Sequence, residues 1–432
     1  MSAVIIFLLL AILMLTGMPV SISLGLTVLI FLFGFTDVPL ESVALKLFTG
    51  IEKFEIMAIP FFILAGNFLT HGGVARRMIN FATSMIGHLR GGLGLSSVFA
   101  CALFAAVSGS SPATVVAIGS IMLPAMVKAG YPKPFGVGVV ASSGGLGILI
   151  PPSIVMVMYA VSTDSSIGAL FMAGVVPGLL LALVLGFTTW NQARKGNYPR
   201  ERKHSWTERW QAFRKSFWGL LLIVVVMGGI YSGIFTPTEA AAMSAVYAFA
   251  VAIFVYKDLG FRDVPKVLIN SANMSAMLLY IITNAVLFSF ILTNEQIPQG
   301  IANWLLESGI GVIGFLIAVN ILLLIMGNFM EPSSIILITA PILFPIAMKL
   351  GIDPIHFGVM ITVNMEIGMI TPPVGLNLFV TAGVAKMSVA NVVKAALPWV
   401  AIMFLFLIIV TYVPWVSTWL PTLMMGPEIV TK

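Results

Sequence analysis

Two short segments of the chain gather hydroxyl, amide and carboxyl side chains around a proline in apolar surroundings. Residues 108–112 are SGSSP, and residues 328–332 are NFMEP. A proline donates no N–H and disfavours a helical residue before it, so a helix is expected to break in each segment. A broken helix leaves free N–H groups at one end and free carbonyls at the other. The first kind of end suits an anion, and the second suits a small cation such as sodium.

Two further segments have the same character, SSGGLGILIPPS at 142–153 and NMEIGMITPPVGLN at 364–377. Together the four segments offer oxygen ligands, which suit hard cations rather than zinc or copper. A hydroxyl in an apolar helix can instead have the structural role of a hydrogen bond to a neighbouring helix. The two acids in these apolar surroundings, Glu331 and Glu366, either take part in function or cap a half-helix. The candidate atoms are backbone carbonyls around Gly145, Ile148 and Ile150 and side-chain oxygens of Ser108, Ser110, Ser111, Thr114, Asn328, Glu331, Ser333, Ser334, Asn364, Thr371 and Asn377.

The composition places these segments in a membrane. Of 432 residues, 59% are hydrophobic and 9% are charged, whereas soluble domains carry about 25% charged residues. The first twenty residues lack the basic start of a signal peptide, and apolar stretches continue to the end of the chain. The single cysteine, Cys101, excludes an internal disulfide. The net charge of +6 is spread over loops, which argues against a nucleic-acid partner. We predict an all-α polytopic membrane protein.

Apolar stretches of about 20 residues mark the expected spans. If 93–127 and 310–347 are re-entrant helical hairpins that enter and leave on one face, each half of the chain has five crossings and the halves are inverted. With the N-terminus outside, all but four of the 22 Lys and Arg residues then lie in inner loops, as the positive-inside rule requires. The four exceptions are Lys46, Lys53, Lys349 and Lys432, and Asp164 is expected in a solvated outer loop. The expected spans are 1–16, 19–35, 56–71, 93–127, 134–161, 167–190, 217–236, 238–256, 273–293, 310–347, 355–384 and 395–417.

The two halves also align in sequence with nearly constant spacing. Matches recur 220 to 222 residues apart, and they include both pairs of adjacent prolines. Inverted repeats with paired broken helices are typical of secondary transporters, whose site lies near the membrane midplane at the repeat interface. The matching positions are Pro112 and Pro332, Pro124 and Pro345, Pro132 and Pro354, FGV at 135–137 and 357–359, Gly147 and Gly368, PP at 151–152 and 372–373, and Pro177 and Pro398.

Positive side chains are missing from most of the predicted core. No Lys or Arg occurs in 134–193, 216–256 or 267–348. An anionic solute would therefore be held by helix N-termini and by co-bound cations, which makes cation coupling a requirement of the site. No phosphate-binding loop or histidine cluster is present, so transport would be driven by an ion gradient. A channel is a weaker alternative, and an intramembrane enzyme lacks a base near Ser110. We predict a cation-coupled, gradient-driven transporter of an anionic solute.

Five motifs in order resemble the large membrane subunit of tripartite ATP-independent periplasmic (TRAP) transporters: SGSSPATVVAIGS, GILIPPS, FTPTEAAA, MEPSSIILITAPILFP and GMITPPVGLNLF. The resemblance implies an elevator-type, sodium-coupled carrier of the ion-transporter superfamily in the bacterial inner membrane. It also implies two partners, a small four-helix membrane subunit, here expected as a separate polypeptide, and a periplasmic substrate-binding protein. The form SSPATVVAIGS resembles the C4-dicarboxylate branch, for which succinate, malate or fumarate is the expected solute. Sialic acid or another carboxylated solute is the alternative.

The same resemblance places sodium ions at the hairpin tips and the breaks that face them. The implied sodium ligands are Ser108, Ser110, Gly145, Ile148, Pro151, Asn328, Gly368, Ile370 and Thr371. The solute is expected to contact the residues beside them, namely Ser111, Pro112, Thr114, Ser153, Glu331, Ser333, Ser334 and Asn377. No other cofactor is expected.

The expected organisation alternates static and moving parts. Residues 1–90 and 217–309 are expected to form the scaffold, because their unbroken spans carry no binding features. Residues 91–190 and 310–417, with the hairpins and broken helices, are expected to form the transport unit. A basic cytoplasmic loop at 191–216 joins the halves, and 418–432 is expected to be a periplasmic tail.

Overall fold

A computed structural model describes residues 2–36 and 38–427, apart from the side chains of residues 40, 305 and 306. Within that part of the chain every regular element is a helix. Nine of the described helices are long and apolar enough to cross a membrane, which confirms the prediction of a multi-span, all-α protein. Lys432 and the end of the predicted tail, 428–432, lie outside the described residues.

The first half of the chain forms eleven α-helices and one 3-10 turn. In order these are α1 (Ser2–Leu15), α2 (Val20–Phe35), α3 (Leu40–Thr49), η1 (Phe54–Met57), α4 (Ala58–His71), α5 (Val74–Ile86), α6 (Gly92–Ser108), α7 (Ser111–Lys128), α8 (Lys133–Ser143), α9 (Leu146–Leu149), α10 (Ile154–Thr163) and α11 (Ile167–Lys195).

The second half forms ten α-helices and one π-helical turn. These are α12 (Trp206–Tyr231), α13 (Pro237–Ala250), η2 (Val251–Val255), α14 (Val264–Asn294), α15 (Ile297–Glu307), α16 (Val312–Gly327), α17 (Pro332–Lys349), α18 (Pro354–Gly368), α19 (Leu376–Ala385), α20 (Val389–Tyr412) and α21 (Trp415–Met425).

All four segments singled out in the sequence interrupt helices. The helix α6 ends at Ser108 and α7 begins at Ser111, while α16 ends at Gly327 and α17 begins at Pro332. The second and fourth segments separate α8 from α10, with the single turn α9 between them, and α18 from α19. Both proline pairs, at 151–152 and 372–373, are joined by cis peptide bonds. The prolines and glycines therefore predicted the helix ends correctly.

The structure differs from the expected boundaries where the two halves join. The predicted loop 191–216 is mostly helical, because α11 extends to Lys195 and α12 already begins at Trp206. A capping box starts α12, in which the Ser205 hydroxyl accepts from the Glu208 N–H and the Glu208 carboxylate accepts from the Ser205 N–H. This local signal stabilises a polar first turn before the apolar part of the helix begins.

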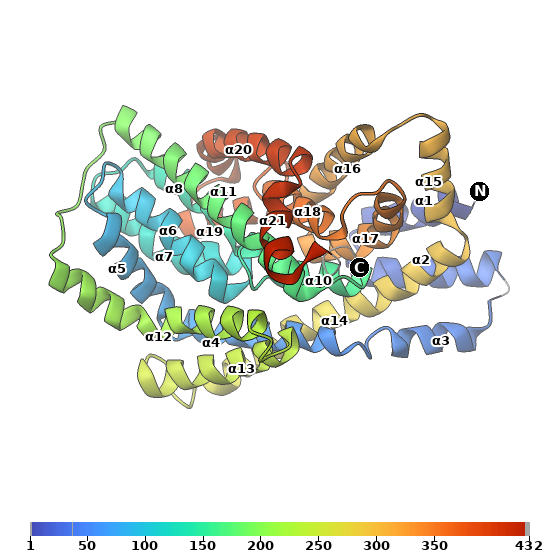
Figure 1. The fold of residues 1–432 in the computed structure, drawn as a ribbon, viewed down its shortest axis with the longest axis horizontal. Coiled ribbons are helices and arrows are strands. Elements are labelled where there is room, and N and C mark those ends of the chain that lie inside the picture. The colour runs from blue at the N-terminus through green and yellow to red at the C-terminus, as the bar shows by residue number, and fades with distance from the viewer. Residues whose placement is uncertain (1, 37, 428–432) are drawn as a thin grey trace.

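The helical pairs that flank the first and second hairpin breaks lie toward opposite ends of the molecule. Figure 1 shows α5, α6 and α7 toward one end and α15, α16 and α17 toward the other, with α10, α18 and α21 between them. The helix α6 packs on α7, and α16 packs on both α17 and α18. The two hairpins therefore lie on opposite sides of α10, α18 and α21.

Buried hydrogen bonds tie the two halves of the chain together. The Tyr159 hydroxyl in α10 donates to the Pro354 carbonyl at the start of α18, 2.7 Å away. The Trp399 indole in α20 donates to the Thr189 hydroxyl in α11 at 3.0 Å. Because both side chains are buried, these bonds fix the register between helices that are about 200 residues apart in sequence.

Candidate functional site

The tip of the first hairpin is a tight turn that only glycine can make without strain. Gly109 has φ +60°, and a Cβ at this position would lie 2.8 Å from the Pro152 carbonyl oxygen. The Gly109 carbonyl accepts a hydrogen bond from the Ile154 N–H at 3.4 Å. The hairpin tip therefore rests directly on the first broken helix, because a glycine allows its backbone to approach so closely.

Buried hydroxyl groups form hydrogen bonds with each other and with the backbone at the first hairpin tip. The hydroxyl oxygens of Ser108 and Thr114 are 2.9 Å apart, and both side chains are buried. The Thr114 hydroxyl donates to the Ser110 carbonyl at 2.8 Å. These contacts use hydroxyl donors but leave oxygen lone pairs, so the tip can still act as an acceptor toward a cation.

Ser111 connects the hairpin tip to both broken helices. Its hydroxyl donates to the Gly144 carbonyl at 3.0 Å and accepts from the side-chain amide of Asn377 at 2.5 Å. Ser111 and Asn377 are 266 residues apart in sequence, and both are fully buried. The structure thus brings two predicted solute-binding residues, one from each half, into direct contact.

Ser153 starts the helix that follows the first break. Its hydroxyl donates to the Ile148 carbonyl at 2.5 Å and accepts from the Met156 N–H at 3.4 Å, as an N-cap residue does. The Ile148 carbonyl, a predicted sodium ligand, therefore has one lone pair occupied and one remaining.

Glycines let the breaks approach the hairpins and each other. A Cβ on Gly147 would lie 2.6 Å from the Ser110 carbonyl oxygen, and one on Gly327 would lie 2.9 Å from the Gly368 Cα. Gly147 and Gly368 are matching positions of the sequence repeat. In each half, therefore, a hairpin tip packs against the backbone of the broken helix.

The second hairpin tip is held to its break by backbone and amide contacts. The Gly375 N–H donates to the Asn328 carbonyl at 3.0 Å. The Asn328 side-chain nitrogen, in its hydrogen-bonding orientation, lies 3.3 Å from the Leu324 and Thr371 carbonyls. The Thr371 hydroxyl donates to the Ile367 carbonyl at 2.7 Å. Two predicted sodium ligands, Asn328 and Thr371, are neighbours here.

Glu331 caps the helix that follows the second hairpin tip. One carboxylate oxygen accepts from the Ser333 hydroxyl at 2.7 Å, and the other accepts from the Ser334 N–H at 3.4 Å. These three predicted solute-binding residues therefore form one group at the start of α17. In the described part of the chain no hydrogen bond joins this group to the pair of Ser111 and Asn377.

Glu366 is not among the predicted sodium or solute ligands, although its surroundings make it a candidate. It is fully buried, and within the described residues neither carboxyl oxygen has a hydrogen-bond partner. A Cβ on Gly145 would lie 2.6 Å from one of those oxygens, so the acid of the second half faces the break of the first. An intramembrane acid was the only signal in the sequence, since nothing there pairs Glu366 with Gly145.

These features define a class of protein. Many of the helices are apolar, and some are broken at positions that match between the two halves of the chain. Buried side-chain oxygens and free backbone groups gather at these breaks, an arrangement typical of membrane transport proteins. The family of the chain follows from comparison with known proteins. A model of the tripartite ATP-independent periplasmic transporter, DctM component, matches residues 7–416. The chain belongs to this family, and it is a transporter permease rather than an enzyme.

Curated relatives match over nearly the whole chain. The C4-dicarboxylate TRAP transporter large permease protein DctM of Rhodobacter capsulatus is 68% identical, with 98% of this chain and 100% of the relative covered. The protein of the same name from Vibrio cholerae is 54% identical, with both chains covered completely. The isethionate TRAP transporter permease protein DctMQ of Oleidesulfovibrio alaskensis is 44% identical, with 94% of this chain and 64% of that protein covered.

A solved structure has a similar fold. The YdaH transporter of Alcanivorax borkumensis matches with a TM-score of 0.66 over 88% of this chain and 90% of that one. Its sequence is 16% identical, so the likeness concerns the fold alone.

Proposed function

We propose that this chain is the large membrane subunit of a sodium-coupled importer for a small organic acid, most specifically a C4-dicarboxylate. The observation that carries the proposal is the contact of Ser111 with both Asn377 and the Gly144 carbonyl. It joins the hairpin tip of one half to the broken helices of both halves, where a repeat-interface site is expected. The names of the relatives at 68% and 54% identity supply the substrate class.

Sodium ions would bind at the two hairpin tips and their facing breaks. In the first half the ligands are drawn from Ser108, Ser110, Gly145, Ile148 and Pro151, and in the second from Asn328, Gly368, Ile370 and Thr371. The support is the supply of carbonyl and hydroxyl oxygens at both tips, which fits a hard monovalent cation. The close backbone contacts at Gly147 and Gly368 would keep those oxygens in place.

The solute would lie beside these ions, near the start of α7 and the start of α17. Ser111, Pro112, Thr114, Ser153 and Asn377 would form one part of its site, and Glu331, Ser333 and Ser334 the other. Helix N-termini favour an anion by about 0.3–2 kcal/mol each. A dicarboxylate can therefore be held without arginine, provided that Glu331 is protonated or engaged with a cation.

The chain would lie in the bacterial inner membrane with its N-terminus in the periplasm. The hairpins α6–α7 and α16–α17 would be re-entrant from opposite faces, which their position toward opposite ends of the molecule supports (Figure 1). In an elevator mechanism, a transport unit of residues 91–190 and 310–417 would move past a scaffold of residues 1–90 and 217–309. The segment 191–216 would face the cytoplasm, and 418–432 would face the periplasm.

Two partner proteins would complete the transporter. A small four-helix membrane subunit would bind the scaffold, and a periplasmic binding protein would deliver the solute. The family supports both, and the relative DctMQ, whose name joins two components, supports the first.

Reconstitution tests the proposed function. The purified membrane subunits in liposomes, supplied with each candidate binding protein, should import succinate, malate or fumarate saturably, and only with an inward sodium gradient. Uptake that does not saturate and ignores sodium would indicate a channel. Preferred import of a neutral or cationic solute would refute the proposal, and preferred import of sialic acid would replace the substrate class only.

A further inference from the structure

A cavity of about 390 Å³, lined by both polar and apolar residues, lies between the predicted scaffold and the predicted transport unit. Lys46, Thr49, Lys53 and Ser289 line it from the scaffold side, and Ser162 and Asp164 line it from the other side. Cavities that hold small molecules begin at about 300 Å³. This cavity is therefore large enough for a small solute, and none of the predicted sodium or solute ligands lines it.

The charged residues of the cavity are two lysines and one aspartate, so its lining is net positive. Lys46 and Lys53 are also two of the four cations that the positive-inside count leaves on the outer face. Among the described residues Lys46 makes no ion pair, and its ammonium lies 5.6 Å from the centre of the Phe290 ring. A lysine in this position remains available to an anion.

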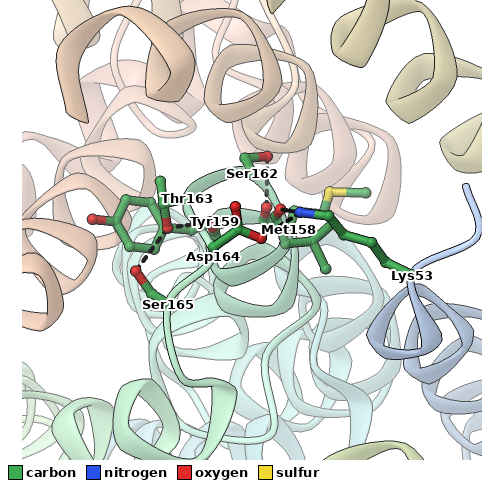
Figure 2. A network of polar contacts seen from close by, with 8 residues as sticks. Lys53, Met158, Tyr159, Ser162, Thr163, Asp164 and Ser165 are labelled. Carbon is green, nitrogen blue, oxygen red and sulfur yellow. Dashed lines mark hydrogen bonds and ion pairs between the residues drawn. The ribbon is translucent and has the colours of Figure 1, made fainter. Parts of the chain in front are cut away.

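Lys53 reaches across the boundary between the two predicted units. Figure 2 shows its ammonium at the end of α10, where it donates to the Asp164 carboxylate at 2.5 Å and to the Val161 carbonyl at 3.0 Å. Asp164 was expected to be solvated, and its side chain is indeed 83% exposed although it is paired; that of Lys53 is 39% exposed. Exposed ion pairs are weak, so another carboxylate can compete with Asp164 for Lys53.

We propose that this cavity is a capture site for a small dicarboxylate, with Lys46 and Lys53 as its binding cations. The inference rests on the proposed function, because it assumes that the transported solute is a dicarboxylate. One carboxylate of the solute binds Lys46, and the other displaces Asp164 from Lys53. Capture therefore also breaks the contact that ties the segment before η1 to the end of α10.

Protection of an introduced cysteine from labelling tests the site. Cys101, the one native cysteine, is buried. In spheroplasts that keep the intact membrane complex but have lost the periplasmic binding protein, Thr49→Cys should react with a membrane-impermeant maleimide. Succinate at millimolar concentration should slow this labelling, whereas succinamide, its uncharged diamide, should not.

Two controls separate a local site from a general effect. Leu45→Cys lies on the same helix α3, is 62% exposed and does not line the cavity, so succinate should leave its labelling rate unchanged. Adding Lys46→Gln to Thr49→Cys should weaken the protection about fivefold in succinate concentration, as expected for the loss of one charge interaction. Adding Lys349→Gln, a lysine outside the cavity, should not.

Each outcome decides the proposal. Protection of Thr49→Cys that needs Lys46 and spares Leu45→Cys supports it. Equal protection by succinamide, protection of both cysteines, or protection that survives Lys46→Gln with Lys53→Gln overturns it. Sodium-dependent succinate uptake by the same Thr49→Cys complex, with binding protein restored, checks the proposed function separately. Uptake without protection refutes only the capture site, and absence of succinate uptake by the unmodified complex refutes the proposed function.

Discussion

Gly327 and Gly368 are in backbone contact, so that a Cβ on the first would lie 2.9 Å from the Cα of the second. This contact joins the end of the first arm of the second hairpin, α16, to the end of α18, where the second break begins. Its counterpart in the first half is the approach of Gly147 to the Ser110 carbonyl. In both halves, a glycine of the broken helix at the same repeat position, Gly147 or Gly368, allows the hairpin backbone to pack closely against that helix.

We expect Gly327→Ala to destabilise the protein. The added methyl group would force the backbones of α16 and α18 apart, and overpacking of this kind costs about 1–3 kcal/mol. The thermal unfolding temperature of the purified protein in detergent measures the effect. Gly383→Ala is the matched control, since a Cβ at that position in α19 meets nothing within 4 Å. Equal unfolding temperatures for the two variants would contradict the packing argument.

The bond between Ser111 and Asn377 should appear as an energetic coupling between the halves. In a double-mutant cycle, Ser111→Ala and Asn377→Ala should be non-additive in unfolding free energy by about 0.6 kcal/mol, the average for hydrogen bonds between membrane helices, and by at most about 1.7 kcal/mol. Ser143→Ala is a suitable control partner for Asn377→Ala, because the Ser143 hydroxyl bonds to Val139 and Cys101 instead. Additivity in both cycles would show that the Ser111 contact contributes nothing.

The sequence was most informative where local chemistry decides the structure. Pro112 and Pro332 located the hairpin breaks, because each lies in the first turn of the helix that follows, where a missing N–H costs nothing. Proline alone is not sufficient, since Pro124 lies inside α7. The short helices α3 and α15 were not predicted. They are too short to span a membrane, and their apolar residues share a stretch with charged or polar ones.

Long-range contacts could not be predicted from one sequence. Lys53 and Asp164 are 111 residues apart, and Glu366 faces Gly145 only because the two halves pack together. The repeat predicted that the breaks would meet, but it did not specify which side chain would meet which backbone atom. The roles predicted for Gly145, Ile370 and the other sodium ligands remain predictions, since side-chain chemistry alone does not select coordinating atoms.

We predict that Ser110→Ala and Thr371→Ala raise the sodium concentration needed for half-maximal uptake. Loss of one oxygen ligand worth about 1 kcal/mol would raise it roughly fivefold. Sodium titration of solute uptake in proteoliposomes measures this shift. Thr362→Ala is the control for Thr371→Ala, because both hydroxyls bond to a carbonyl four residues earlier but Thr362 lies inside α18. Normal uptake with unchanged sodium dependence in both test variants would remove the sodium assignment.

Glu331→Gln should change the sodium or pH dependence of uptake without unfolding the protein. A glutamine keeps one acceptor oxygen, so it can retain one of the two hydrogen bonds that Glu331 accepts from the Ser333 hydroxyl and the Ser334 N–H, but it removes the charge. Uptake measured across sodium concentration and pH, beside an unfolding curve, separates the two effects. Glu331→Ala removes the cap as well and should lower stability by about 0.5–2 kcal/mol. If Glu331→Gln transports like the parent under all conditions, Glu331 is only a helix cap.

A crosslink between the two predicted units should stop transport. Lys53 and Asp164 fall in opposite predicted units and are in contact, so Lys53→Cys with Asp164→Cys can be joined by a short flexible thiol crosslinker. In an elevator mechanism the end of α10 must slide past the segment before η1, and a covalent bridge prevents this.

A bridge within the scaffold is the control: Phe54→Cys with Thr238→Cys joins η1 to α13, where the Thr238 hydroxyl lies 3.4 Å from the Phe54 carbonyl. Uptake by the crosslinked first pair should fall to background, and when a cleavable linker is cut it should return to the level of the same double variant before crosslinking, while the second pair should keep transporting. Full uptake through a verified Lys53–Asp164 bridge would argue for a rocking motion in place of an elevator.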